Sequence, residues 1–252
     1  MALFFQLAFW LHVVAGGVAL SVFWIPLVTK KGGPLHRRVG WVYVGAAATI
    51  AVTAFVNCAR MLTDGIPRND RAGVFLAYVG LLAAESALHG VRALGTKGRT
   101  SGARSPIDVA PAALLGAGGM ALAVYGLRVA TPLYLAFGVL GLALATGHLR
   151  FWLRAPVTRR EWFYAHMTGM GTSCITTVTA FVVVNAHRFG LGTFSPLVWL
   201  TPTAVGATGL LLWRRRLSPP SPMAPRVTAF PFASKHGDGD ESCRESSGPV
   251  DS

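Results

Sequence analysis

Several ionisable side chains lie inside long apolar stretches of the sequence, where they could carry a proton or bind a metal. Glu85 and His89 are four residues apart and therefore face the same side of a helix. His12 and Glu85 each lie about 13 Å along a helix from one end of their stretch, close to the centre of a bilayer. Because an isolated charge is costly there, we expect Glu85 to be neutral or paired with a histidine, and we predict a contact with His12. His12, Glu85 and His89 form either a proton-carrying group or a structural polar contact.

Three histidines predict a second kind of site. His89, His148 and His166 lie in the inner third of their stretches, and two imidazoles at one depth on neighbouring helices can bind b-type haem through its iron. His166, Met170 and Cys174 are spaced i, i+4 and i+8, so a helix places these soft ligands on one face, which suits copper. The alternative is structural, since such histidines also bond to a neighbouring helix and such Met and Cys side chains also fill packed faces.

The stretch KKGGPLHRRVGWVY, residues 30–43, combines a turn with a cluster of basic side chains. Gly33 and Pro34 can turn the chain into a helix, because proline suits the first helical turn. Free N–H groups at the helix start and basic side chains then form a site for a phosphate, an acidic lipid or a quinone headgroup. The alternative is a basic turn that only touches lipid headgroups. The candidate residues are Lys30, Lys31, His36, Arg37 and Arg38.

Membrane helices must position all of these residues. The chain has 252 residues, of which 52% are hydrophobic, and a mean hydropathy of +0.49, too apolar for an ordinary soluble domain. Seven stretches approach the length of about 20 residues that crosses the hydrocarbon, and lipid offers their backbones no hydrogen-bond partners. We therefore predict an all-α bundle of seven transmembrane helices. The stretches are Leu3–Val28, Val39–Ala59, Gly73–Leu94, Val109–Leu127, Pro132–His148, Trp162–His187 and Pro196–Trp213.

The Lys and Arg residues alternate between the two sides of this bundle. Of the 23, 18 fall within residues 29–38, 92–106 and 150–161 or follow residue 213. Because cytoplasmic segments retain Lys and Arg, we predict an outside N-terminus and a cytoplasmic C-terminus. This topology, together with attraction to anionic inner-leaflet lipids, accounts for the net charge of +13 and argues against nucleic-acid binding.

Two regions differ in composition. Residues 1–216 are predicted to form the transmembrane bundle, and residues 217–252, rich in Ser, Pro and Gly, a disordered cytoplasmic tail. The topology keeps the three cysteines apart, so no disulfide framework is expected. Small residues at four-residue steps predict close helix contacts. These steps are Gly16 with Leu20, Gly40 with Val44 and Gly141 with Ala145, and Gly116–Gly119 adds a local cluster.

Three segments resemble an uncharacterised family of bacterial multi-pass membrane proteins of unknown function. They are LHVVAGGVAL in the first stretch, KGGPLHRRVGWVYV entering the second and HMTGMGTSCITTVTAFVVVN in the sixth. The resemblance covers about residues 3–216 and implies a location in the bacterial cytoplasmic (inner) membrane. Gly169 replaces an arginine of the family pattern, which weakens any anion-binding role of that helix. The resemblance implies no activity. The matching positions are His12, Gly16, His36, Arg37, Gly40, His166, Met170 and Asn185.

Three functional classes remain open, and no sequence signature of a hydrolase, a nucleotide-binding loop or a zinc protease points to an enzyme. The leading one is a non-enzymatic small-solute or proton-linked transporter, or an accessory membrane subunit. The second is a membrane redox protein that binds b-type haem or a quinone through the inner histidines. The third is a structural or lipid-interacting bundle.

Overall fold

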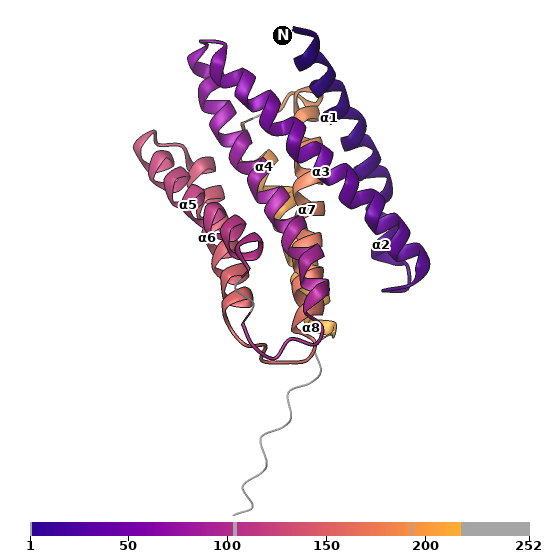
Figure 1. The fold of residues 1–252 in the computed structure, drawn as a ribbon. Helices are drawn as coiled ribbons and strands as arrows, with labels where there is room; N and C mark the ends of the chain where they lie inside the picture. The colour runs from indigo at the N-terminus through magenta and orange to yellow at the C-terminus, as the bar shows by residue number, and fades with distance from the viewer. Residues whose placement is uncertain (1, 103–104, 193, 218–252) are drawn as a thin grey trace, which may run out of the picture. The chain divides into compact units, whose positions relative to one another are not determined.

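The structure, a computed structural model, describes residues 2–102, 105–192 and 194–217, which form helices joined by short connections (Figure 1). No strand occurs in these ranges. Seven helices are long and apolar enough to cross a membrane, so the predicted all-α, seven-span bundle is confirmed. The predicted tail lies outside the described residues, apart from Leu217. The elements are α1 (Ala2–Val22), α2 (Trp24–Val28), α3 (Pro34–Thr63), α4 (Pro67–Ala93), the 3-10 turn η1 (Leu94–Thr96), α5 (Pro106–Arg128), α6 (Pro132–Leu153), α7 (Glu161–Asn185), η2 (Ala186–Phe189) and α8 (Pro196–Leu217).

Prolines determine where most of the helices begin. The helices α3, α4, α5, α6 and α8 all start at a proline, which lacks the N–H that a first helical turn leaves unbonded. The predicted role of Pro34 is confirmed, with Gly33 as the residue that caps the helix. Pro26 has the opposite effect within the first span. It cannot donate to the carbonyl of Val22, and the helix is divided there into α1 and α2.

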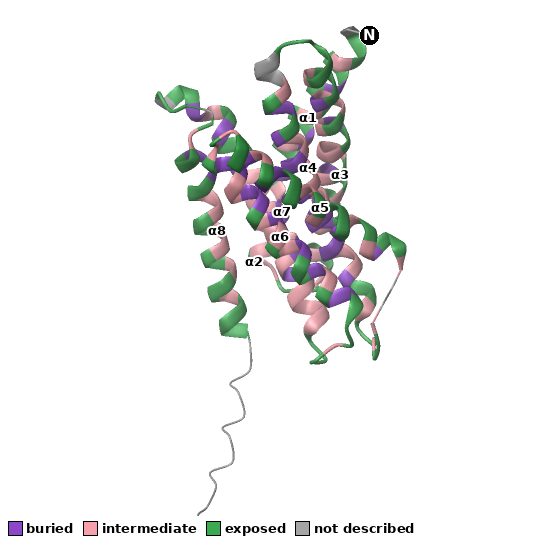
Figure 2. Cartoon of the chain, turned by 90° about the vertical axis from the view of Figure 1, so that its left-hand side faces the viewer, coloured by how far each residue is buried: buried purple, intermediate pink, exposed green. Residues whose placement is uncertain are grey.

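The helix α4 lies at the centre of the packing. It contacts α3, α5, α6 and α7, and it has the largest buried share of the seven spans. By contrast, α8 has the smallest buried share and presents mostly exposed and half-buried positions (Figure 2). Because ionisable groups in a membrane helix normally face the bundle interior, the central position of α4 explains why it carries both Glu85 and His89.

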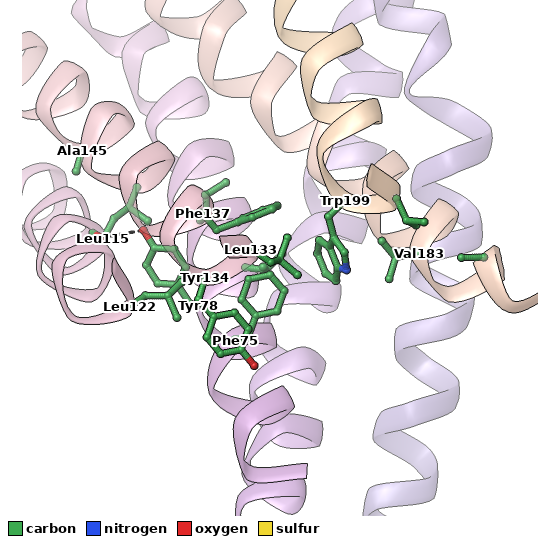
Figure 3. Packing of buried hydrophobic residues seen from close by; sticks show 14 residues of the cluster. Phe75, Tyr78, Leu115, Leu122, Leu133, Tyr134, Phe137, Ala145, Val183 and Trp199 are labelled. Carbon is green, nitrogen blue, oxygen red and sulfur yellow. Dashed lines mark hydrogen bonds between the residues drawn. The ribbon is translucent and has the colours of Figure 1, made fainter. Parts of the chain in front are cut away.

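An aromatic core fixes α4 against α6 and α8. The rings of Phe75 and Tyr134 stack with centroids 4.9 Å apart, and Trp199 meets the Phe75 ring edge-on, also at 4.9 Å (Figure 3). Phe137 adds edge contacts to both Phe75 and Trp199. Such pairs contribute about 0.5–1.5 kcal/mol each beyond the area that they bury. Since Phe75 precedes Glu85 by less than three turns, this core sets the register in which α6 faces Glu85.

Glycines bring α5 close to α6. A Cβ on Gly138 would lie 2.6 Å from the backbone nitrogen of Ala123, and one on Gly119 would lie 2.9 Å from the Gly138 carbonyl. The predicted close contacts are thus confirmed for the Gly116–Gly119 cluster and for Gly141, which meets the Tyr78 ring. They are wrong for Gly16 and Gly40, where a Cβ would meet no atom within 4 Å.

Candidate functional site

A buried hydrogen-bonded pair joins α4 to α6. The Nδ1–H of His148 donates to both carboxylate oxygens of Glu85, at 2.9 and 2.8 Å. Glu85 is 3% exposed and His148 4% exposed. The carboxylate can only accept, so it fixes the proton on Nδ1 and leaves Nε2 of His148 with a lone pair. A carboxylate that orients a histidine in this way is typical of the surroundings of a metal-binding imidazole.

His89 completes the pair from the next turn of α4. Its ring stacks on that of His148, with centroids 3.7 Å apart and an interplanar angle of 10°. Phe151 and Trp152 contact His89 edge-on at 5.2 and 5.4 Å, and they form an aromatic wall around it. Axial haem ligands must lie on opposite faces of a porphyrin, so this face-to-face stack is not a haem-binding pair. In this arrangement His89 and His148 do not present their nitrogens as a haem-binding pair, and the haem site stays a prediction.

An ion pair between Arg92 and Asp108 lies beside the group formed by Glu85, His89 and His148. The guanidinium of Arg92 on α4 binds Asp108 in the first turn of α5 through two contacts, one from Nε to Oδ1 and one from Nη2 to Oδ2 at 3.0 Å. The Asp108 side chain is 4% exposed, whereas that of Arg92 is 36% exposed. Arg92 follows Glu85 by seven residues and His89 by three, so all three lie on one face of α4.

A small cavity lies beside Glu85 and His89 on one side and the Arg92–Asp108 pair on the other. Its volume is about 10 Å³, counted as the space open to the centre of a water-sized sphere, which suffices for one water-sized particle. Both carboxylates reach it, from α4 and from α5. The lining residues are Glu85, Leu88, His89, Arg92, Ile107, Asp108, Pro111 and Trp152.

Two imidazole nitrogens at this position have no hydrogen-bond partner. They are Nδ1 of His89 and Nε2 of His148, and both are inaccessible to solvent. A buried polar atom left unpaired costs about 1–3 kcal/mol. One ligand atom each from Glu85, His89 and His148 lies within 4.8 Å of the others, close enough for a single metal ion. This is the one such group of three or more His, Cys, Asp or Glu within the described ranges.

The predicted contact between His12 and Glu85 is wrong. Nδ1 of His12 lies 3.0 Å from Oγ1 of Thr53, whose own hydroxyl donates to the Thr49 carbonyl at 2.7 Å. The cause is helix packing, since α1 lies against α3, while α4 faces α6 with its acidic side chain. The broader expectation that Glu85 pairs with a histidine is confirmed. That histidine is His148, because α6 continues to Leu153 and thus holds His148 deeper than the predicted end of its span.

The remaining histidine candidates lie elsewhere. Nδ1–H of His166 donates to the Gly90 carbonyl at 2.8 Å, and that of His36 donates to the Pro26 carbonyl at 3.1 Å. Their ring centroids lie 6.4 Å apart. Met170 and Cys174 pack in an apolar cluster with buried Tyr43, as the structural alternative predicts, and Cys174 is not part of the group formed by Glu85, His89 and His148.

The basic residues between positions 30 and 38, at the end of α2 and the start of α3, are of two kinds. The ammonium of Lys31 donates to the carbonyls of Pro26 and Leu27 at 2.7 and 2.5 Å and lies 4.7 Å from the centre of the Trp213 ring. Burial lowers the pKa of this amine. Lys31 and His36 thus stabilise the end of α2. The side chains of Lys30, Arg37 and Arg38 are exposed and can meet lipid headgroups.

Sequence reasoning missed Arg92 and Asp108. Both lie near the ends of the predicted apolar stretches, where Arg92 counts only as a charge of the connection and Asp108 belongs to no candidate group. One available signal was the seven-residue step from Glu85 to Arg92, which places the two on one helix face. Another was Asp108 directly before an apolar stretch. Their pairing across α4 and α5 could not be read from spacing.

Comparison with family models, with curated proteins and with solved structures gave no match. The chemistry of the site therefore has to be argued from its own geometry. The resemblance to a family of bacterial membrane proteins stays a prediction.

Proposed function

We propose that this multi-pass membrane protein binds one divalent transition-metal ion inside the bundle, at Glu85, His89 and His148. The observation that carries the proposal is the pair of buried, unpartnered nitrogens beside a carboxylate, with ligand atoms of all three residues within 4.8 Å of one another. A contact that only packs two helices together does not require buried nitrogens with free lone pairs. A metal ion uses the lone pairs that are otherwise left without a partner.

The ligand types indicate which ions fit. Imidazole and carboxylate together suit zinc, manganese and ferrous iron, whereas thiolate or thioether ligands suit monovalent copper. Here the cluster offers two imidazoles and one carboxylate, and the sulfurs of Met170 and Cys174 lie in the other cluster. We therefore expect a borderline divalent cation rather than monovalent copper.

One movement completes the coordination. Glu85 accepts from the Nδ1–H of His148 and so fixes the direction of Nε2, which faces away from the carboxylate; in this position Glu85 orients a ligand and does not itself bind the ion. The stacked ring of His89 must turn for its Nδ1 to meet the same ion. No hydrogen bond opposes that turn, since this nitrogen has no partner among the described side chains or backbone. On metal binding, the stack of the His89 and His148 rings is lost and each of the two rings gains one bond to the ion.

The bound ion gives the predicted small-solute transporter a candidate substrate class. Transport of a divalent cation requires a polar site within the bilayer that a dehydrated ion can occupy, and few ionisable groups lie at that depth here. The alternation of Lys and Arg supports an outside N-terminus and a cytoplasmic C-terminus, and the resemblance to bacterial membrane proteins supports a place in the bacterial inner membrane. Exposed Lys30, Arg37 and Arg38 would then contact anionic lipids of the inner leaflet.

The decisive experiment is metal analysis of the full chain purified in mild detergent. After incubation with Zn²⁺ or Mn²⁺ and removal of free ions, we expect about one bound equivalent, and a 10–100-fold weaker affinity in His148→Gln. His187→Gln is the matched control, because His187 is exposed and bonds only to the nearby Val184 carbonyl. Uptake of the same ion by proteoliposomes then separates a carrier from a resident cofactor site. Absence of stoichiometric metal from the wild-type protein would exclude the proposal.

A further inference from the structure

We infer that Asp108 turns from Arg92 to bind the metal ion as a further ligand, and that Arg92 is its counter-ion while the site holds no metal; this inference rests on the proposed function. Asp108 lines the same cavity as Glu85 and His89, from the opposite helix. A carboxylate with so little exposure needs a cationic partner. Arg92 supplies that charge through two contacts.

The charges of the cluster favour an exchange of partners. With Asp108, the site has two carboxylates and two neutral imidazoles, so the negative charge within the site, that of Asp108 and of Glu85 behind His148, balances that of a divalent cation. A divalent ion beside Asp108 also repels Arg92, because both are positive and close together. The Arg92 side chain can move toward solvent, since more than a third of it is exposed, whereas the Asp108 side chain is buried.

Helix geometry allows Asp108 to serve both partners. It lies in the first turn of α5, and Pro111 lies three residues later in the same helix and also lines the cavity. Because proline donates no hydrogen bond, the carbonyl of Ile107 lacks its usual helical donor there. The start of α5 is therefore less constrained by backbone bonding than a regular helix. For Asp108 to bind the ion, its carboxylate must turn from Arg92 toward the cavity that it lines.

A carboxylate ligand from Asp108 also determines which metal ions the site prefers. Two imidazoles and two carboxylates favour Mn²⁺, Fe²⁺ and Zn²⁺ over monovalent copper. A monovalent cation leaves one negative charge unbalanced in a buried site, which is costly. Arg92 therefore disfavours monovalent cations, because they compete with its guanidinium for Asp108 less strongly than a divalent ion does.

The test compares Zn²⁺ and Mn²⁺ affinities of the full chain in detergent. Asp108→Asn removes the ligand, and we expect an affinity about tenfold weaker or worse. Arg92→Gln removes the competitor, so we expect tighter binding, while Arg92→Lys keeps the charge and should change affinity little. The double variant Arg92→Gln with Asp108→Asn should bind as weakly as Asp108→Asn alone. Size-exclusion profiles and melting temperatures establish that each variant is folded.

The two proposals fail in distinguishable ways. A wild-type protein without stoichiometric Zn²⁺ or Mn²⁺ overturns the proposed function and this inference with it. Metal binding that depends on His148 but is unchanged in Asp108→Asn overturns only the inference. Weaker binding in both Arg92→Gln and Asp108→Asn also overturns it, because a purely structural ion pair predicts the same sign for both. Should Arg92→Gln not fold, the Asp108→Asn and double variants still decide.

Discussion

His148 and Glu85 meet across the interface of α6 and α4, with the imidazole N–H shared between two carboxylate oxygens at 2.9 and 2.8 Å. Both side chains are almost completely buried. Removal of one partner leaves the other buried without its hydrogen bond, which commonly costs about 1–3 kcal/mol. The contact thus stabilises the bundle and orients the free nitrogen of His148, and variants must separate these two effects.

Glu85→Gln should separate them. The amide keeps the shape and an oxygen that can accept from Nδ1–H of His148, so we expect the protein to fold. The lost charge should weaken metal affinity about 10–100-fold. The measurement is bound metal per protein after purification. Glu161→Gln is the matched control, because that carboxylate caps the Val157 N–H outside the site. Equal metal content in wild type and Glu85→Gln would contradict the assignment of Glu85.

Gly169→Ala should destabilise the contact between α4 and α7. A Cβ at this position would lie 2.6 Å from the Ser86 carbonyl oxygen and 2.7 Å from the Gly90 nitrogen. Backbone atoms cannot move aside cheaply, so we expect a loss of about 1–3 kcal/mol, seen as a lower melting temperature. Gly16→Ala is the control, because a Cβ there meets nothing within 4 Å. Identical melting temperatures for the two variants would disagree with this packing.

Thr53→Val should show that the His12 contact is structural. The variant removes the hydroxyl that faces Nδ1 of His12 and with it one hydrogen bond of that ring. We expect a loss of about 1 kcal/mol of stability and an unchanged metal content. Thermal unfolding and metal analysis of the same sample give both quantities. A large loss of metal would return His12 to the list of functional candidates.

Chelation should lower the melting temperature of the wild-type protein. A ligand at 100 times its dissociation constant stabilises the folded state by about 2.7 kcal/mol. Chelator treatment should remove this contribution, and added Zn²⁺ or Mn²⁺ should restore it. His148→Gln, with its weaker affinity, should show a clearly smaller response to both treatments. An equal response in that variant would place the bound ion elsewhere.

Reporter fusions should resolve the orientation of the bundle. The connection at residues 29–33 and the segment at residues 97–102 carry basic residues, whereas the connection at residues 64–66 carries an acid and no base. We expect fusions in the first two to report a cytoplasmic position and fusions in the third to report the opposite side. Residues 29–33 on the outer side would reverse the topology, and with it the placement of anionic-lipid contacts.

Hydropathy was sufficient to predict seven helices, because the requirement for apolar length and internal backbone bonding acts on each segment alone. The helix ends were less predictable. For example, α6 continues through Arg150 to Leu153, since charged side chains are tolerated where a helix enters the headgroup region.

The candidate site was predicted in its members but not in its pairing. Glu85, His89 and His148 were each visible as ionisable groups in apolar surroundings. Which histidine meets Glu85 depends on helix packing, and that is set by glycines and aromatic rings distributed over several helices. Asp108 and Arg92 escaped notice because a charge at a span end looks the same whether it faces water or a partner.

The glycine contacts between α5 and α6 have a mechanical consequence. Those two helices pack more extensively with each other than either does with α4. They should therefore behave as one rigid hairpin, and the line along which His148 and Asp108 meet α4 is the natural place for the bundle to part. Access for an incoming ion then requires only a tilt of this hairpin, and faster amide exchange at the start of α5 than at its Gly119 contact would be the signature of that movement.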